Sequence, residues 1–176
     1  MAVTEKKNIW FYSSTDGTPP PVRTYQMSAS QGIFMPGAPV LIHTTGTLNL
    51  AADEAPTLLG YVVGVVDPST TWPLTAALAV NDEVRVAIAR PGDVYGVYLD
   101  DAGDNEAAVQ LYVGDTPSMT VDGTAGMVGY VTADITATGG TMFRIIDLMY
   151  NVNPEKFPIA ADPGAVLVVH NGTLQG

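Results

Sequence analysis

Apolar and polar side chains alternate most regularly in the middle of the chain. From Val84 to Ala89 a branched apolar residue occupies the even positions, which gives the two-residue period of a strand with one buried face. Arg90-Pro91-Gly92-Asp93 then supplies the proline and glycine of a tight turn. Val94 to Leu99 follows as a second run rich in β-branched and aromatic residues, which favour strands. We predict a β-hairpin here, with Tyr95 and Tyr98 on opposite faces.

Further short apolar runs, separated by glycine, proline and aspartate, predict strands along the rest of the chain. The one stretch with a helical tendency is residues 74–80. Several short strands with turn residues between them indicate an all-β fold, either a small β-barrel or a β-sandwich. The predicted strands lie at residues 39–44, 57–66, 84–89, 94–99, 107–113, 118–122, 127–132, 141–148 and 166–170.

Residues 1–30 differ from the rest and predict an extended N-terminal arm, with the β body (residues 31–176) starting at residue 31. Trp10, Phe11 and Tyr12 form an aromatic cluster. Pro19-Pro20-Pro21 favours a polyproline II segment, which cannot join a central strand. A disordered, solvated terminus is the alternative, but such tails seldom carry three adjacent aromatic residues. We therefore predict that these aromatics and prolines contact other subunits.

The β body contains two similar tetrads, Leu59-Gly-Tyr-Val62 and Val128-Gly-Tyr-Val131. Each follows an apolar run and precedes a strand with an embedded arginine, Arg85 in the first case and Arg144 in the second. This pattern favours two related β units and a closing strand. Chance similarity between strands rich in glycine and valine is the alternative, because the intervening lengths differ. The units and the closing strand are expected at residues 31–90, 107–150 and 164–171.

The balance of charge restricts the class of partner. Only 14% of the 176 residues are charged, against about 25% in typical soluble proteins. Either other subunits cover part of the surface, or small residues replace charged ones there; both interpretations are open. The net charge of −11 argues against a nucleic-acid partner, which requires neutralised phosphates. Lys6, Lys7 and Arg23 leave the first thirty residues nearly neutral and suited to an acidic neighbour, including another copy of the chain.

The sequence contains no pattern of catalytic or cofactor-binding residues. It has no cysteine, which removes thiolate nucleophiles, disulfides and cysteine-ligated zinc. His43 and His170 match no paired-ligand spacing, so we expect each to be a surface or interface residue. A G-x-S-x-G nucleophile motif and a phosphate-binding glycine loop are also absent from the sequence. We expect neither enzyme activity nor a cofactor.

The acidic run from Asp100 to Glu106 is the best candidate for a ligand site. It offers four carboxylates and Asn105, which are oxygen ligands of the kind that Ca²⁺ prefers. The run does not match the EF-hand pattern, and a solvated turn after a strand is the alternative. We predict no metal site.

The chain shows no targeting or membrane segment. Its N-terminus lacks the apolar stretch of a signal peptide, and no run approaches the roughly 20 apolar residues of a membrane helix. We expect synthesis in the cytoplasm and no membrane partner.

Three pieces follow one another between Pro36 and Ala89, namely Pro36-Gly-Ala-Pro-Val40, then, after a loop rich in threonine and alanine, Leu59-Gly-Tyr-Val-Val-Gly-Val65, and Asn81-Asp-Glu-Val-Arg-Val86. In this order, over about a third of the chain, they resemble the capsid decoration (cement) proteins of tailed bacteriophages. The resemblance implies a small β-barrel or β-sandwich that binds the outside of the head, commonly as a trimer or dimer. Such proteins bridge major capsid subunits against internal DNA pressure. The proline-rich arm departs from the pattern, and no site residue is carried over.

Residues and resemblance together predict a structural protein of the virion exterior. The expected partners are the major capsid protein and further copies of the chain, as a homotrimer or a dimer. The alternative is a carbohydrate-binding β-sandwich or a tail-fibre module, in which Trp72, Tyr95, Tyr98 and Tyr112 supply a sugar platform. Placing Tyr95 and Tyr98 on opposite faces weakens that alternative. The predicted contact residues are Trp10, Phe11, Tyr12, Pro19, Pro20, Pro21 and Trp72.

Overall fold

The computed structural model describes residues 8–28, 31–53, 57–67, 77–100, 110–122, 129–138, 140–153, 164–171 and 173–174. Within these residues the fold is all-β, as predicted, and two sheets pack together. Two short helical turns accompany the strands, η1 (Gln110–Tyr112) and α2 (Met149–Val152). The strands are β1 (Trp10–Ser13), β2 (Val22–Gln26), β3 (Pro39–Ile42), β4 (Leu48–Leu50), β5 (Thr57–Leu58), β6 (Gly60–Val65), β7 (Glu83–Ile88), β8 (Val94–Leu99), β9 (Pro117–Asp122), β10 (Tyr130–Thr138), β11 (Phe143–Leu148), β12 (Ala165–His170) and β13 (Thr173–Leu174).

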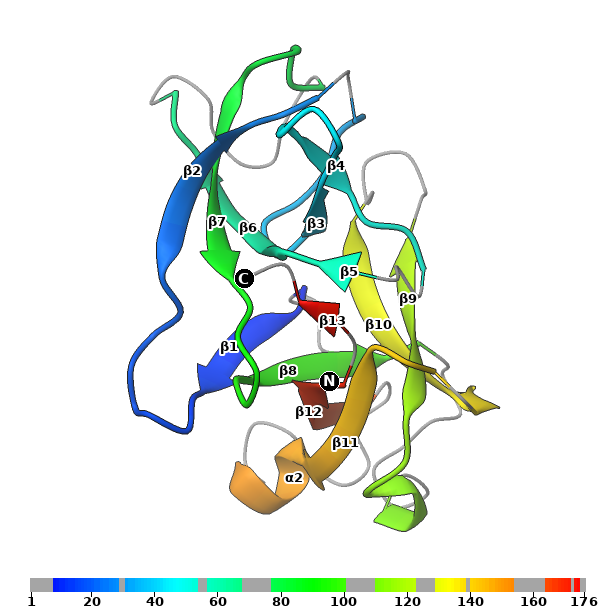
Figure 1. The fold of residues 1–176 in the computed structure, drawn as a ribbon. Coiled ribbons are helices and arrows are strands. Elements are labelled where there is room, and N and C mark those ends of the chain that lie inside the picture. Colours follow the sequence, from blue (N-terminus) through cyan, green and yellow to red (C-terminus); the bar gives the residue numbers. More distant parts are fainter. Residues whose placement is uncertain are drawn as a thin grey trace.

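The first sheet has five antiparallel strands in the order β2-β7-β6-β3-β4 (Figure 1). Its two ends meet, because Met27, directly after β2, forms a parallel bridge with Leu48 of β4. The Ser28 N–H also donates to the Leu48 carbonyl over 2.9 Å. The sheet thus curls into a small barrel whose interior holds Met27, Phe34, Val40, Leu48, Leu59, Val62, Val84 and Val86.

The second sheet is mixed and follows the order β11-β12-β8-β10-β9, with β1 also paired to β8. Two strands share one edge of β8. β1 runs antiparallel along Val94–Gly96, and β10 runs parallel along Tyr98–Leu99. At the far side Ile145 of β11 exchanges backbone hydrogen bonds with Gly114 and Asp115, over 2.9 and 3.0 Å, so β11 also meets the segment before β9.

The two sheets meet through a shared apolar core. Tyr61 of β6 and Leu58 of β5 belong to the same buried cluster as Tyr95 and Val97 of β8. The short parallel pair β5–β13 lies between the sheets in Figure 1. The opposite face of β8 is covered separately, since Tyr98 packs with Trp10, Met149 and Leu167. Tyr95 and Tyr98 therefore lie on opposite faces, which confirms that prediction.

The predicted hairpin between residues 84 and 99 is wrong, although both of its strands exist. β7 lies between β2 and β6 in the first sheet, whereas β8 lies among β1, β10 and β12 in the second. The Arg90–Asp93 turn is a corner by which the chain passes from one sheet to the other. Local turn chemistry predicts a reversal of the chain, but pairing is decided by the strands that occupy the two edges.

The predicted division into an arm and a body also needs correction over residues 8–28. Ile9 is 5% exposed and Met27 is 1% exposed, and they lie in the cores of the two sheets. β1 and β2 are hydrogen-bonded members of those sheets. Pro21 ends its polyproline segment by accepting a hydrogen bond from the Ile88 N–H over 2.9 Å, which uses its carbonyl and needs no N–H. Residues 1–7 lie outside the described residues.

The described residues of the two similar tetrads differ in structure. Gly60 is the first residue of β6, whereas Gly129 precedes β10 with a φ of +83°. β6 pairs directly with β7, which carries Arg85, but the strand with Arg144, β11, pairs with β12. The matched sequence positions are thus not matched in pairing.

Two predicted elements differ as well. Within the strand predicted at 107–113, residues 110–112 form the 3₁₀ turn η1, and residues 107–109 lie outside the described residues. Residues 77–80 of the predicted helical stretch are not helical, and residues 74–76 are not among those described.

Candidate functional site

A groove of about 490 Å³ opens between β1 and the first sheet. Val63 lies at a bulge in β6, where Val62 and Gly64 oppose consecutive residues of β7. The extra residue at a bulge has no partner, and the Val63 side chain is accordingly 49% exposed. Among the described residues no charged side chain lines the groove, although the chain carries a net charge of −11. The lining residues are Asn8, Ile9, Trp10, Phe11, Met35, Pro36, Gly37, Tyr61, Val62, Val63, Ala87 and Tyr95.

The aromatic cluster of β1 contributes to this groove and is anchored on β8. The Trp10 ring lies 5.5 Å from that of Tyr98, and the Phe11 ring lies 6.0 Å from that of Tyr95. Successive side chains of β1 point to opposite faces of the sheet, so Trp10 packs on one face of β8 and Phe11 packs on the other. Tyr12 is 40% exposed. Of the three predicted contact aromatics, Tyr12 is the one that faces solvent most fully.

Replacing Gly96 by alanine is expected to displace the Trp10 indole. A Cβ at this position would overlap the six-membered part of the ring, so we expect a loss of about 2 kcal/mol of unfolding free energy, as for other overpacked sites. Thermal melting monitored by tryptophan emission measures both effects. Gly64→Ala is the matched control, because its new Cβ would meet the flexible end of Arg85 at 3.3 Å. Equal melting temperatures for the two variants would contradict this packing.

The predicted proline contacts are divided between surface and interior. Pro20 is buried, whereas Pro19 and Pro21 are exposed. Trp72 lies outside the described residues. The structure therefore brings Trp10 and Phe11 together in one groove, and it does not place the prolines there.

Asn8 joins three backbone segments at the inner end of the groove. Its side-chain amide donates to the carbonyls of Pro36 and Gly129 over 3.0 and 2.9 Å. Its carbonyl oxygen accepts from the N–H groups of Ile9 and Val131, both over 2.8 Å. All four hydrogen-bonding positions of the amide are thereby used. Because β1 and β10 share an edge of β8, Asn8 ties the start of one to the start of the other and to the first sheet.

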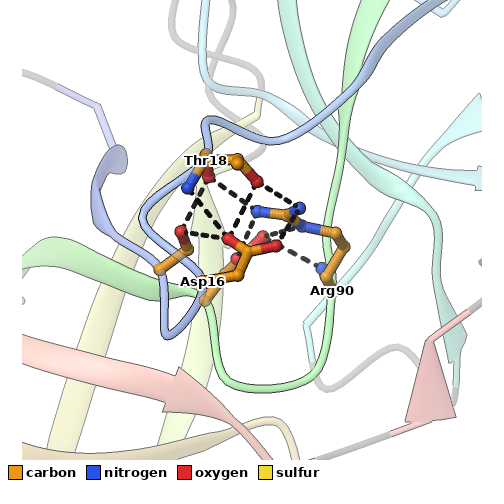
Figure 2. Close-up of polar contacts among 5 residues, drawn as sticks. Asp16, Thr18 and Arg90 are labelled. Carbon is orange, nitrogen blue, oxygen red and sulfur yellow. Dashed lines mark hydrogen bonds and ion pairs between the residues drawn. The ribbon is translucent and has the colours of Figure 1, made fainter.

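A second polar cluster fixes the loop between β1 and β2 to the corner between the sheets (Figure 2). The Arg90 guanidinium binds Asp93 through its Nε and Nη2 atoms, over 3.2 and 3.0 Å. The same group donates to the Thr18 carbonyl over 2.9 Å and contacts Asp16 at 3.3 Å. The Asp93 side chain is 2% exposed. Its charge is neutralised by the planar Arg90 guanidinium, which binds it in a bidentate manner.

This cluster has a structural role. The pKa of Asp16 is held well below its usual value, chiefly by the Thr18 backbone N–H and then by the hydroxyls of Ser14 and Thr18. The pKa of Arg90 is raised, chiefly by its hydrogen bonds to Asp93. Both groups stay charged at neutral pH, and neither is available as a proton donor or acceptor. The cluster thus locks the turn that the sequence mispredicted as a hairpin.

A third cluster lies where the sheets meet and contains His170. The Nε2 atom of His170 is 2.8 Å from the Tyr61 hydroxyl, and the two rings stack with centroids 5.6 Å apart. The rings of Tyr95 and Phe143 flank the imidazole at 5.2 and 5.5 Å. Burial lowers the pKa of His170 to about 4, against a smaller opposite effect of the Met142 backbone. His170 is half-buried, with its ring packed among aromatic side chains where the sheets meet, so the prediction of a surface residue is only partly right. His43 is exposed.

The remaining candidate features are a hollow at the first sheet and the acidic run. A polar hollow of about 450 Å³ at the end of the first sheet is lined by hydrogen-bonding side chains, among them His43, and by Val80. Among the described residues no group of three or more histidine, aspartate or glutamate side chains is placed to hold a metal ion. Of the acidic run, only Asp100 lies within the described part of the chain. No helix in that part is long and apolar enough to cross a membrane.

Comparisons with known proteins add no assignment. No protein-family model matches this chain, and no match is found among curated proteins.

Proposed function

We propose that this chain is a structural protein of a bacteriophage virion, which binds the outside of the head and stabilises the lattice of the major capsid protein. One observation carries the proposal beyond the resemblance itself. The three pieces that resemble decoration proteins are distant in sequence, but they contribute the strands β3, β6 and β7. These strands are direct neighbours in the first sheet. The resemblance therefore extends over one continuous structural unit.

The groove between β1 and β6 is the proposed contact with the major capsid protein. Its described lining is largely apolar and carries no charged side chain, which favours an apolar segment of the partner over a basic one. Depletion of charge at the centre of a patch is typical of protein–protein interfaces. On a lattice, each copy repeats the same modest contact, and the summed affinity grows by multivalency.

The proposed function requires binding but no catalysis. Its alternative, a carbohydrate-binding or tail-fibre module, requires an exposed aromatic platform. Tyr95 and Tyr98 are 2% and 6% exposed and lie on opposite faces of the second sheet, so they form no such platform.

Replacing Val63 by glutamate is expected to weaken binding to phage heads by about 10-fold or more, because a charge would be buried at an uncharged interface. The side chain is 49% exposed in the free chain, so folding should be unaffected within about 0.5 kcal/mol. Co-sedimentation with heads assembled without this chain measures the binding.

Val152→Glu is the matched control. Val152 is 41% exposed, on α2, and does not line the groove. Equal binding by both variants would exclude the groove as the contact. Failure of the unmodified chain to bind heads, together with binding to immobilised glycans, would favour the carbohydrate-binding alternative.

A further inference from the structure

The groove between β1 and the first sheet follows one edge of β1. Its lining includes both Trp10 and Phe11, although Trp10 packs with Tyr98 on one face of β8 and Phe11 packs with Tyr95 on the other. A groove that contacts side chains on both faces of a strand runs along the edge of that strand. β8 occupies one edge of β1, and Figure 1 draws β1 between β8 and the first sheet. The groove therefore lies along the edge that β8 does not occupy.

The register of β8 shows which backbone groups of β1 face the groove. The Leu99 N–H donates to the Gly164 carbonyl over 3.0 Å, at the edge that β8 shares with β12. Hydrogen-bonded positions alternate along an antiparallel pair, so Gly96, three positions earlier, directs its backbone groups to the opposite edge, toward β1. Trp10 lies opposite Gly96 and is therefore a hydrogen-bonded position of β1. Phe11, the next residue, directs its N–H and C=O away from β8, toward the groove.

Arg85 places a positive charge beside the groove. It lies on β7 two residues before Ala87, which lines the groove, so both side chains are on the outer face of the strand. Its guanidinium lies beside Gly64, where a Cβ would be 3.3 Å from the Nη2 atom, and Gly64 follows Val63 of the groove lining. Within the described part of the chain Arg85 forms no ion pair, although Glu83 lies two positions away on the same face. An exposed, unpaired cation in a chain of net charge −11 favours an acidic partner at this place.

We propose that the groove binds an extended, largely apolar segment of the major capsid protein, which carries a carboxylate for Arg85. The segment lies beside β1 as an added strand, and its backbone exchanges hydrogen bonds with the N–H and C=O of Phe11. Its apolar side chains pack between β1 and β6, where the described lining carries no charged side chain. In strand addition the main chain supplies affinity and the side-chain pockets supply specificity. This inference rests on the proposed function, and it adds the conformation and the charge of the partner segment.

Other forms of the partner segment fit these groups less well. A helix uses its own N–H and C=O groups internally, so it would cover the Phe11 backbone without pairing it, and a buried backbone group without a partner is unfavourable. A segment with lysine or arginine beside its apolar residues would bring like charges together at Arg85. An extended acidic segment pairs the Phe11 backbone and the Arg85 charge at once.

Replacing Arg85 by glutamine is expected to weaken binding to phage heads by about 5-fold or more and to reduce its dependence on salt, because one charge pair is lost. Arg144→Gln is the matched control. Arg144 is likewise exposed, on β11, and does not line the groove. Co-sedimentation with heads assembled without this chain, at two ionic strengths, measures both effects. Equal binding by the two variants would overturn the acidic partner segment.

The added strand is tested at the backbone of Phe11. Phenyllactic acid, introduced at position 11 by cell-free translation, replaces the N–H by an ester oxygen and keeps the ring beside Tyr95. We expect binding to heads about 5-fold weaker, because one hydrogen bond is lost, while thermal melting shows a folded chain. In the unmodified chain, amide hydrogen exchange at Phe11 should slow by about 10-fold or more on binding to heads. Unchanged exchange, or full binding by the folded ester chain, would overturn the strand addition.

The outcomes separate this inference from the proposed function. If Val63→Glu abolishes binding to heads while Arg85→Gln and the Phe11 ester bind as the unmodified chain does, the groove remains the contact and the extended acidic segment is excluded. Failure of the unmodified chain to bind heads would overturn the proposed function, and this inference with it. Weaker binding by Arg85→Gln and by the ester, with Arg144→Gln unchanged, is the expected result.

Discussion

Replacing Asn8 by alanine is expected to lower the unfolding free energy by about 3 kcal/mol or more. The substitution removes four hydrogen bonds at once and leaves the N–H groups of Ile9 and Val131 and the carbonyls of Pro36 and Gly129 without their partner. A buried polar group that loses its partner costs about 1–3 kcal/mol. Water entering the groove can compensate the Pro36 carbonyl, which is only partly buried, so the total is smaller than four separate losses.

Asn8 also fixes the position of a neighbouring strand. Asn8 holds β1 at the edge that β8 shares with β10, and Gly37 leaves room for it, since a Cβ there would lie 2.9 Å from the Asn8 side chain. Asn8→Asp tests the same point without creating a cavity. It replaces the amide donor by an oxygen that faces two carbonyl oxygens, so we expect a destabilisation at least as large.

Chemical denaturation monitored by circular dichroism measures both Asn8 variants. Asn171→Ala is the control, because Asn171 is exposed and surface substitutions usually change stability by less than about 0.5 kcal/mol. Destabilisation of Asn8→Ala by no more than this control would show that the four contacts contribute nothing measurable to folding.

The strands themselves could be predicted because each carries its own periodic signal. β3, β7, β8, β9, β11 and β12 all fall within about two residues of the predicted positions, and the strand predicted at 57–66 is divided into β5 and β6. Partner choice carries no such local signal. The Arg90–Asp93 turn is followed by a strand of the other sheet because Arg90 is bound to Asp93 and to the Asp16–Thr18 loop, and the last of these partners lies more than seventy positions away in the chain.

The segment predicted as an arm shows the opposite difficulty. Its prolines and aromatic residues predict an extended segment, and residues 10–13 and 22–26 are indeed extended. Their partners, β8 and β7, are distant in sequence. The pattern therefore could not show that this extended segment pairs within its own chain and not with another subunit. Asn8 had no recognisable signal, because a lone asparagine before an apolar run is also typical of a turn.

His170 could have been placed correctly from the sequence. In a strand that includes Val166 and Val168, residue 170 has the same parity and therefore the same face. Val166 and Val168 are both fully buried in the core between the sheets. Treating the histidine as the end of the apolar run, rather than as its continuation, led to the surface assignment.

The stability of the protein is expected to fall as the pH falls from about 6.5 to about 4, because of His170. Its pKa is lowered from 6.5 to about 4 by burial. Above pH 6.5 both the folded and the unfolded chain carry a neutral imidazole, and this group makes no pH-dependent difference. Between the two values the unfolded chain binds a proton that the folded chain does not bind, so stability is lost progressively. Below about pH 4 the folded state is protonated too, and this contribution levels off.

The size of the effect is at most about 3 kcal/mol, from 1.36 kcal/mol for each pKa unit. No carboxylate contacts the imidazole to offset the charge, since its described ring neighbours are Tyr61, Tyr95 and Phe143. The pKa values of both tyrosines are raised by burial, so neither becomes an anion in this range. Asp16, whose pKa is lowered from 3.8, contributes its own loss only at more acidic pH.

His170→Phe should remove this pH dependence while keeping an aromatic ring between Tyr61 and Phe143. The variant gives up the Tyr61 hydrogen bond, at a cost of about 1 kcal/mol at neutral pH, so its stability should cross that of the unmodified chain as the pH falls. Denaturation at several pH values between 7 and 4 measures both curves, and His43→Gln, at an exposed position, should follow the unmodified chain. Parallel curves for His170→Phe and the unmodified chain would place the acid sensitivity elsewhere.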